Sequence, residues 1–251
     1  MAWNSNQYLK FENERTQPCV DLITRLDGSY NRILDLGCGP GNSTLQLRNA
    51  FGNAEITGFE ADSNMIKKAR TDYPDIKFVH GFAPDDLDKL DGKFDLVFSN
   101  ACIHWIKEQK KLIDSISDVI DIKGTLAVQV PLTEESVFYQ ILYKLIEKKW
   151  GKLKFIQNFY NLNYMEYYNL LIKKFKSVSI WKTDYYHIVD EKMIIEWYKG
   201  SGLRPYLEAL NQSEQDEFIY DLQERISENY KPADNGKYFL IMPRLFFIAS
   251  R

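Results

Sequence analysis

The first stretch with residue types suited to binding or catalysis is residues 33–44, Ile-Leu-Asp-Leu-Gly-Cys-Gly-Pro-Gly-Asn-Ser-Thr. Asp35 ends a short apolar stretch, and residues 32–36 predict a buried strand. Three glycines follow at alternate positions: Gly37, Gly39 and Gly41. Asn42 or Ser43 can cap a helix after them. A strand, a glycine-rich turn and a helix N-terminus let a ligand contact bare backbone, so the stretch predicts a ligand-binding loop.

A second carboxylate, Glu60, follows the next predicted strand at residues 55–59. Both oxygens of a carboxylate accept hydrogen bonds, so Glu60 at a strand end can hold the two hydroxyls of a ribose. Asp62 can cap the helix that follows, in which Met65 and Ile66 share one side. The alternative for Glu60 is a solvated side chain at a strand end.

Apolar stretches continue to alternate with helical patterns up to residue 130. Strands are predicted over residues 76–79, 94–98 and 125–130. A helix over residues 112–120 is predicted before the last strand, closed by Lys123-Gly124 as a C-cap. Five strands that alternate with helices are typical of a parallel sheet with helices on both faces. Ligands bind at the carboxyl ends of such strands, so one site should collect the residues there. They are Asp35, Glu60, Phe82 and Asn100.

The segments outside this sheet are more helical and more aromatic. Near the start, Arg15 precedes a predicted helix with one apolar face, formed by Cys19, Leu22, Ile23 and Leu26. After residue 131, helices are predicted over 135–150, 163–175, around 193–197 and over 213–229. Ser213 and Asp216 have the spacing of a capping box. The last strands are predicted over 178–187 and 237–250, the second interrupted at Pro243-Arg244.

Composition excludes several classes of protein. The chain has 251 residues, 45% of them hydrophobic, and a net charge of −3, which gives no basic field for nucleic acid. Residues 1–30 are too polar for a signal peptide, and no apolar run suggests a membrane span. The odd number of cysteines without metal-ligand spacing predicts reduced thiols in the cytoplasm and no metal site. They are Cys19, Cys38 and Cys102.

The loop at residues 33–44 resembles motif I of the class I S-adenosylmethionine (SAM) methyltransferases, and residues 99–105 resemble motif IV, where a strand end faces the methyl group. A dinucleotide site would use G-x-G-x-x-G, whose third glycine position falls here on Asn42. The resemblance implies a Rossmann-like fold, with a mostly parallel seven-stranded sheet, helices on both faces and a helical cap over the strand carboxyl ends. SAM would be the cofactor.

Other stretches are similar to the bacterial trans-aconitate 2-methyltransferases over nearly the whole chain. They include Trp3-Asn4, Glu14-Arg15, Leu126-Ala127-Val128-Gln129, Tyr185-Tyr186-His187, Gly202-Leu203-Arg204-Pro205 and Pro243-Arg244-Leu245-Phe246. This resemblance implies a methyl ester formed on trans-aconitate. It also implies a single domain over residues 1–251, with a SAM-binding core at 30–131. The segments that would cover the substrate are 1–29, 132–176 and 188–236.

The resemblance to the SAM methyltransferases implies a set of cofactor-binding residues. Asp35 would hold the ammonium group of SAM, directly or through water, and Glu60 the ribose. The full set is Asp35, Gly37, Cys38, Gly39, Glu60, Ala61, Met65, Phe82, Ala83 and Asn100. Phe82 departs from the family, which usually has an acidic residue there facing the adenine amine. Asp85, Asp86 or the backbone would then supply the acceptor.

The chemistry needs no general base, because a carboxylate with an ordinary pKa near 4 is already an anionic nucleophile at pH 7. It needs alignment and positive charge for the remaining carboxylates, which guanidinium groups grip bidentately. Arg204 and Arg244 are the candidates, and surface ion pairs are the alternative for both. The expected substrate-binding set is Tyr8, Arg15, His104, Trp105, Tyr186, His187, Arg204 and Arg244. His104 and His187 can equally be wall residues.

Three other functions remain open. A methyltransferase of the same fold could act on another carboxylate, such as a malonyl thioester on a carrier protein, and would then need a basic patch around an open mouth. A SAM-binding regulatory protein without turnover would need no room beside the methyl group. The dinucleotide oxidoreductase is disfavoured by the missing third glycine.

Overall fold

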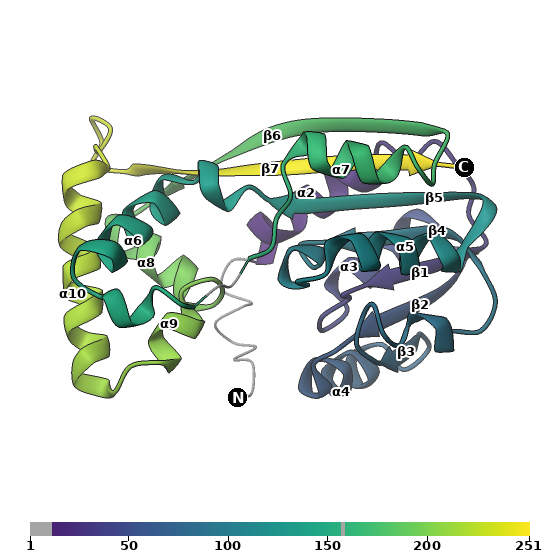
Figure 1. Cartoon of the computed structure of the whole chain (residues 1–251), viewed down its shortest axis with the longest axis horizontal. Helices are drawn as coiled ribbons and strands as arrows, with labels where there is room; N and C mark the ends of the chain where they lie inside the picture. The colour runs from purple at the N-terminus through teal and green to yellow at the C-terminus, as the bar shows by residue number, and fades with distance from the viewer. Residues whose placement is uncertain (1–11, 157–158) are drawn as a thin grey trace.

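One seven-stranded sheet runs through the computed structural model, which describes residues 12–156 and 159–251, with side chains from residue 16 onward (Figure 1). The strands are β1 Arg32–Leu36, β2 Glu55–Glu60, β3 Lys77–His80, β4 Phe94–Asn100, β5 Ile120–Pro131, β6 Ser177–Val189 and β7 Tyr238–Ser250. Their order is β3-β2-β1-β4-β5-β7-β6; the pairs among β1 to β5 are parallel, and β7 runs antiparallel to both β5 and β6. The predicted fold class is confirmed.

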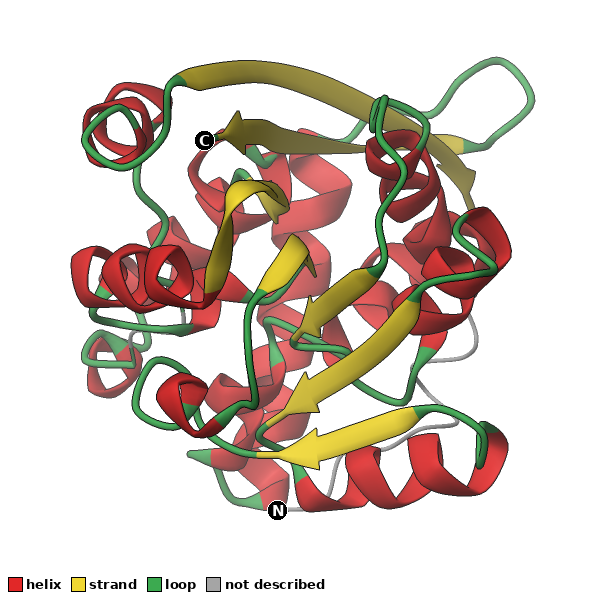
Figure 2. Cartoon of the chain, turned by 90° about the vertical axis from the view of Figure 1, so that its right-hand side faces the viewer, coloured by secondary structure: helices red, strands yellow, loops and turns green. Residues whose placement is uncertain are grey.

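Helices cover both faces of the sheet (Figure 2). On one face lie α2 Glu12–Ile23, α3 Asn42–Ala50 and α4 Ser63–Asp72, and on the other α5 Gln109–Val119 and α7 Tyr164–Leu171. The alternation along β1 explains this arrangement, because Ile33 packs with the α2 side and Leu34 with the α5 side. Both faces are therefore apolar, and polar groups collect at the strand ends.

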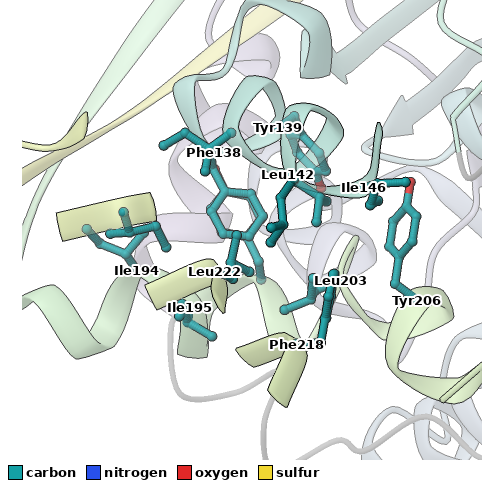
Figure 3. Close-up of a cluster of buried hydrophobic side chains, with 14 of the residues drawn as sticks. Phe138, Tyr139, Leu142, Ile146, Ile194, Ile195, Leu203, Tyr206, Phe218 and Leu222 are labelled. Atoms are coloured by element: carbon teal, nitrogen blue, oxygen red, sulfur yellow. The ribbon is translucent and has the colours of Figure 1, made fainter. Parts of the chain in front are cut away.

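Four helices form a separate helical cap: α6 Val137–Lys148, α8 Glu191–Lys199, α9 Arg204–Glu208 and α10 Gln212–Asn229. Their shared core includes Phe138, Leu142 and Leu222 (Figure 3), and the Phe138 ring stacks on Tyr198 at 3.6 Å between centroids. The cap lies at the opposite end of the molecule from β3 and α4 (Figure 1). The long β6–β7 hairpin spans both parts, because Met242 of β7 belongs to the cap core.

Several predicted boundaries differ from the structure. The helix before β5 ends at Val119, and Gly124 lies inside β5 rather than capping that helix. Pro243-Arg244 does not interrupt β7, since both residues keep their pairing with β6. The segment 163–175 is helical only as α7, which packs against β7 through Tyr167 and Phe247 instead of covering the site. Arg15 lies within α2, not before it.

The capping box at the start of α10 lies two residues before the predicted one. The Asn211 side chain accepts from the Glu214 N–H at 3.1 Å, and the Glu214 carboxylate accepts from the Asn211 N–H at 3.0 Å. Ser213 lies inside the first turn. Two overlapping sequence patterns were present, and the one with glutamate at the third helical position, the residue that a capping box prefers there, forms.

Replacing the true cap should cost more than replacing the predicted one. Asn211→Ala removes the acceptor for the Glu214 N–H and should lower the free energy of unfolding by about 1 kcal/mol. Ser213→Ala, the matched control at an exposed position, should change it by less than about 0.5 kcal/mol. Urea denaturation of both variants measures the difference, and a larger loss for Ser213→Ala would contradict the assignment.

Candidate functional site

A cavity of about 540 Å³ opens at the carboxyl ends of β1, β2, β4 and β5, between the sheet and the helical cap. The glycine loop and Glu60 line one end, and Tyr139 and Tyr198 of the cap line the other. A larger and shallower hollow of about 1320 Å³ lies beside it over α5, but it contacts no residue of the glycine loop. The smaller cavity is therefore the candidate active site.

The glycine loop turns away from β1 in a backbone conformation that a side chain would prevent. Gly37 has φ 76°, and its N–H donates to the Phe59 carbonyl at 2.8 Å. A Cβ at Gly37 would lie 2.1 Å from the Cys102 Sγ. The close approach of the loop to the turn after β4 therefore requires glycine.

Glu60 is fixed at the end of β2 by three backbone donors. Its Oε2 accepts from the Gly39 N–H at 3.0 Å, and its Oε1 accepts from the N–H groups of Ala61 and Asp62 at 2.9 and 2.8 Å. Asp62 in turn caps α4, as predicted. The carboxylate lies on the wall of the cavity, so both oxygens are oriented beside the glycine loop.

Asp35 lies behind the glycine loop. It does not belong to the described residues that line the cavity. It is fully buried, and its Oδ2 accepts from the hydroxyls of Ser43 and Thr44 at 2.7 and 2.6 Å. Burial raises the pKa of Asp35 to about 6, the two hydroxyls lower it in part, and the Glu60 charge raises it. Asp35 thus ties β1 to the start of α3. Its Oδ1 has no hydrogen-bond partner among the described residues.

The ends of β4 and β5 supply uncharged polar groups. Asn100 and Gln129 are register partners on these strands, and both line the cavity. The next turn, η2 Ile103–Trp105, adds His104, which is 3% exposed. Burial, followed by the positive charge of Arg244, lowers the pKa of His104 to about 3, so the ring is neutral at pH 7. His104 is therefore a weak base.

The cap end of the cavity is aromatic. Trp105 lies 4.8 Å from the Phe159 ring, and both line the cavity with Tyr139 and Tyr198. Burial raises the pKa of each tyrosine, so their hydroxyls stay protonated. Among the side chains that the structure describes, Arg244 is the only one on the wall that carries a positive charge at pH 7.

The structure brings most of the predicted residues to this cavity. On its wall are Gly37, Cys38, Gly39, Glu60, Ala61, Met65, Phe82, Ala83, Asn100, His104, Trp105 and Arg244. Tyr8 and the side chain of Arg15 lie outside the described part of the chain. Four other predicted residues are not among the described residues of the wall: Asp35, Tyr186, His187 and Arg204.

Tyr186, His187 and Arg204 are directed elsewhere. Tyr186 is 61% exposed on the outer strand β6, and the His187 ring lies 4.9 Å from that of Trp197. The Arg204 Nε forms an ion pair with Glu208 at 2.7 Å. In the Gly202-Leu203-Arg204-Pro205 turn it is Gly202 that lines the cavity, where a Cβ would meet the Tyr139 hydroxyl at 1.8 Å.

Neither predicted substitute for an acidic residue at Phe82 faces the cavity. Asp86 accepts from the Phe82 N–H at 2.8 Å and pairs with Lys89, while Asp85 pairs with Lys111 at 2.6 Å. Phe82 itself is 57% exposed on the wall. Beyond the end of β3, the described wall of the cavity is formed by Gly81, Phe82 and Ala83.

Sequence reasoning missed Gln129 as a site residue, although it named the stretch that contains it. Gln129 is fully buried at the end of β5, after the apolar run from Leu126 to Val128. A polar residue at the end of a buried parallel strand was the available signal. The tyrosines of α6 and α8 gave no such signal, because aromatic residues are equally common in a core.

Metal-ion clusters and membrane-spanning helices are both absent from the described residues. Within them, no three His, Cys, Asp or Glu side chains are grouped as a metal site would require. None of the described helices has the length and apolarity to cross a membrane.

Replacing Asp35 should change how stability depends on pH. The pKa of Asp35 is raised from 3.8 to about 6, so its contribution to stability is full below the unfolded pKa and is lost as pH rises through 6. The shift corresponds to about 3 kcal/mol. Asp35→Asn does not ionise, so its free energy of unfolding relative to wild type should rise by up to that amount between about pH 4 and 7. His104 titrates in both proteins, so its contribution cancels in the difference between their free energies of unfolding. Chemical denaturation at several pH values measures this difference, and a constant difference would contradict it.

Comparison with known proteins identifies the family. The family described as "Methyltransferase domain" matches residues 33–124. Trans-aconitate 2-methyltransferase of Rhizobium rhizogenes is 36% identical over 267 residues, covering all of both chains. The enzyme of that name from Escherichia coli O157:H7 is 32% identical over 255 residues, covering 99% of this chain and 98% of its own.

Solved structures of low identity share the fold. The YcgJ protein of Bacillus subtilis is 13% identical, with a TM-score of 0.62, over 94% of this chain and 98% of its own. Phosphoethanolamine N-methyltransferase 2 of Haemonchus contortus, solved with S-adenosyl-L-methionine, is 16% identical, with a TM-score of 0.58, over 94% of this chain and 52% of its own. The full-length similarity at more than 30% identity settles the family: the chain belongs to the trans-aconitate 2-methyltransferases, within the methyltransferase-domain proteins.

Proposed function

We propose that the protein is a SAM-dependent carboxyl O-methyltransferase that forms a methyl ester on a small polycarboxylate, with trans-aconitate as the expected substrate. The main support is the position of Arg244, the one described cation on the wall of a cavity that also contains the glycine loop. The relatives named trans-aconitate 2-methyltransferase match the full chain. We place the reaction in the cytoplasm, which suits three free thiols.

The residues at the β1 and β2 ends fit SAM. A Cβ at Gly39 would lie 3.6 Å from the Met65 Sδ, so the loop and Met65 border a narrow slot that a side chain would fill. The oriented Glu60 carboxylate would hold the ribose hydroxyls, and the backbone from Gly37 to Gly39 the amino-acid end of SAM. Phe82 and the backbone beside it would contact adenine. Asp35 would act on the ammonium group through the loop or a water. When bound, SAM supplies a methyl group on a sulfonium, which is an activated leaving group.

The side chains around the substrate have to align and dehydrate it, because the nucleophile is already ionised. His104 is neutral and weakly basic, and the hydroxyls of Tyr139 and Tyr198 are neutral too. With SAM bound, a carboxylate oxygen would receive the methyl group from the sulfonium, which would leave as a neutral thioether, so two opposite charges would cancel. The neutral and aromatic groups of β4, β5, η2 and the cap, which lie between the charged Glu60 and Arg244, favour a step that removes charge.

The charges around the cavity favour a small polycarboxylate over a carrier-bound thioester. A carrier protein needs a basic surface at the mouth, but the neighbouring hollow is lined by both signs of charge. Its lysines are Lys107, Lys110, Lys111 and Lys154, and its acids are Glu108, Asp114, Glu134 and Glu166. The cation lies inside the cavity instead, as Arg244. The cavity also extends from the glycine loop to Tyr139 and Tyr198 of the cap, and a SAM-binding regulator without turnover would not need this space beside the methyl group.

The direct test incubates the protein with methyl-labelled SAM and a panel of mono-, di- and tricarboxylates. Labelled methyl ester should form with trans-aconitate. Its yield should decrease for acids of the panel that have fewer carboxylates. Base-labile label in the product distinguishes an ester from an N-methyl group. Label transferred to none of the polycarboxylates would refute the proposed function.

A paired arginine experiment tests the origin of that preference. Arg244→Met should raise KM for a tricarboxylate about ten- to a hundredfold, because a charge-assisted contact typically contributes about 1.5–3 kcal/mol. KM for a monocarboxylate and the affinity for SAM should change little. Arg204→Met is the matched control, since Arg204 pairs with Glu208. If the two variants change the tri- to monocarboxylate KM ratio equally, Arg244 does not hold the substrate.

A further inference from the structure

Three uncharged polar side chains on the cavity wall have buried atoms without a hydrogen-bond partner among the described residues. They are both amide atoms of Gln129, the Nδ1 of His104 and the Oδ1 of Asn100. Folded proteins seldom leave buried polar groups unsatisfied, because each one loses the hydrogen bonds that it makes with water. Three such groups around one cavity indicate that a ligand completes them.

The order of the strands places these groups between the glycine loop and Arg244. Asn100 of β4 pairs with Gln129 of β5, and residues paired on adjacent parallel strands point to the same side of a sheet. Arg244 of β7 pairs with Pro131, two residues beyond Gln129. Because the sheet order is β1-β4-β5-β7, the wall changes from the glycine loop to neutral groups and then to a cation.

The carboxylates of a bound polycarboxylate have to lie along this order of groups on the wall. The carboxylate that reacts lies next to the SAM end, so it meets the groups from β4, η2 and β5, and a second carboxylate reaches Arg244 on β7. Neutral donors suit the reacting group for a physical reason. A cation bound to the nucleophile would withdraw its electron density and would also place a second positive charge beside the sulfonium.

We propose that Gln129 and His104 position the reacting carboxylate as uncharged hydrogen-bond donors, while Arg244 holds a second carboxylate; this inference rests on the proposed function. The Gln129 amide has two N–H donors, and a neutral His104 has one. Asn100 borders the same position from β4. The two residues are positioning and specificity residues, and neither transfers a proton.

Gln129→Met tests the proposal, because it keeps the length of the side chain and removes both polar atoms. KM for the polycarboxylate should rise about ten- to a hundredfold, while SAM affinity is unchanged. The melting temperature of the ligand-free protein should stay or rise, since an unsatisfied buried amide is lost.

Gln215→Met is the matched control. Gln215 lies in the cap, where its amide donates to the carbonyls of Leu207 and Leu210 at 2.9 and 3.0 Å. Its loss should lower the melting temperature and leave KM unchanged. The opposite result for Gln129→Met, a lower melting temperature with an unchanged KM, would make Gln129 a structural residue and overturn the proposal.

His104 is tested by the charge that it carries during binding. His104→Gln keeps an uncharged donor and should retain kcat/KM within about threefold, whereas His104→Phe should lose at least about tenfold. The wild-type kcat/KM should not fall as pH rises from about 6 to 8.5, because the His104 ring stays neutral throughout. A profile that falls as pH rises through about 6.5 in wild type but not in His104→Gln would show that a protonated His104 binds the substrate, and would overturn the inference.

The outcome for wild type separates this inference from the proposed function. If wild type methylates no polycarboxylate, the function itself fails. If wild type is active and both Gln129→Met and His104→Phe keep its KM, the function stands and the neutral-donor arrangement fails.

Discussion

The hydrogen bonds of two carboxylates hold the glycine loop, and the rest of the site is placed relative to that loop. Glycines contribute no side-chain packing, so a loop rich in them needs anchors from elsewhere. Asp35 joins the strand before the loop to the helix after it through Ser43 and Thr44, and Glu60 accepts the Gly39 N–H from the cavity side. The raised pKa of Asp35 indicates that a buried charge is kept there at a cost in stability. Such a cost is typical of residues retained for a site rather than for the core.

The order of the strands in the sheet makes the charge along the cavity wall change from negative to neutral to positive. Acidic Glu60 ends β2, neutral Asn100 and Gln129 end β4 and β5, and cationic Arg244 lies on β7. A cationic methyl donor next to a polycarboxylate has the complementary order. Burial keeps the middle of the wall neutral, because it lowers the pKa of His104 and raises that of Tyr198. The same low polarity that prevents ionisation of these side chains favours the cancellation of charge in the reaction.

Sequence patterns predicted those features that depend on neighbours along the chain. The strands, the position of Glu60 and the Asp62 cap follow from local alternation and from strand ends. Side-chain direction depends on tertiary packing, and there the sequence was insufficient. Arg204 and Arg244 have the same charge, yet only Arg244 lines the cavity; the acidic Glu208 four residues after Arg204 was the usable signal of a local ion pair. Asp35 lies near the end of β1, as predicted. The sequence does not show whether its side chain lies on the cavity side of the glycine loop or on the opposite side.

The antiparallel strand β7 makes substrate recognition and cap position depend on each other. Arg244 is fixed in register between Pro131 of β5 and Thr183 of β6, and two residues earlier Met242 is already packed in the cap core. The hairpin is held to the other side of the molecule by the Tyr185 hydroxyl, which donates to Asp21 of α2 at 2.5 Å. A displacement of the cap would therefore act on the strand that carries the cation, with no flexible linker between them. The strand that packs into the cap core thus also carries the cation on the cavity wall, and a carboxylate bound in that cavity would offset the cost of a charged residue inside an otherwise apolar segment of β7.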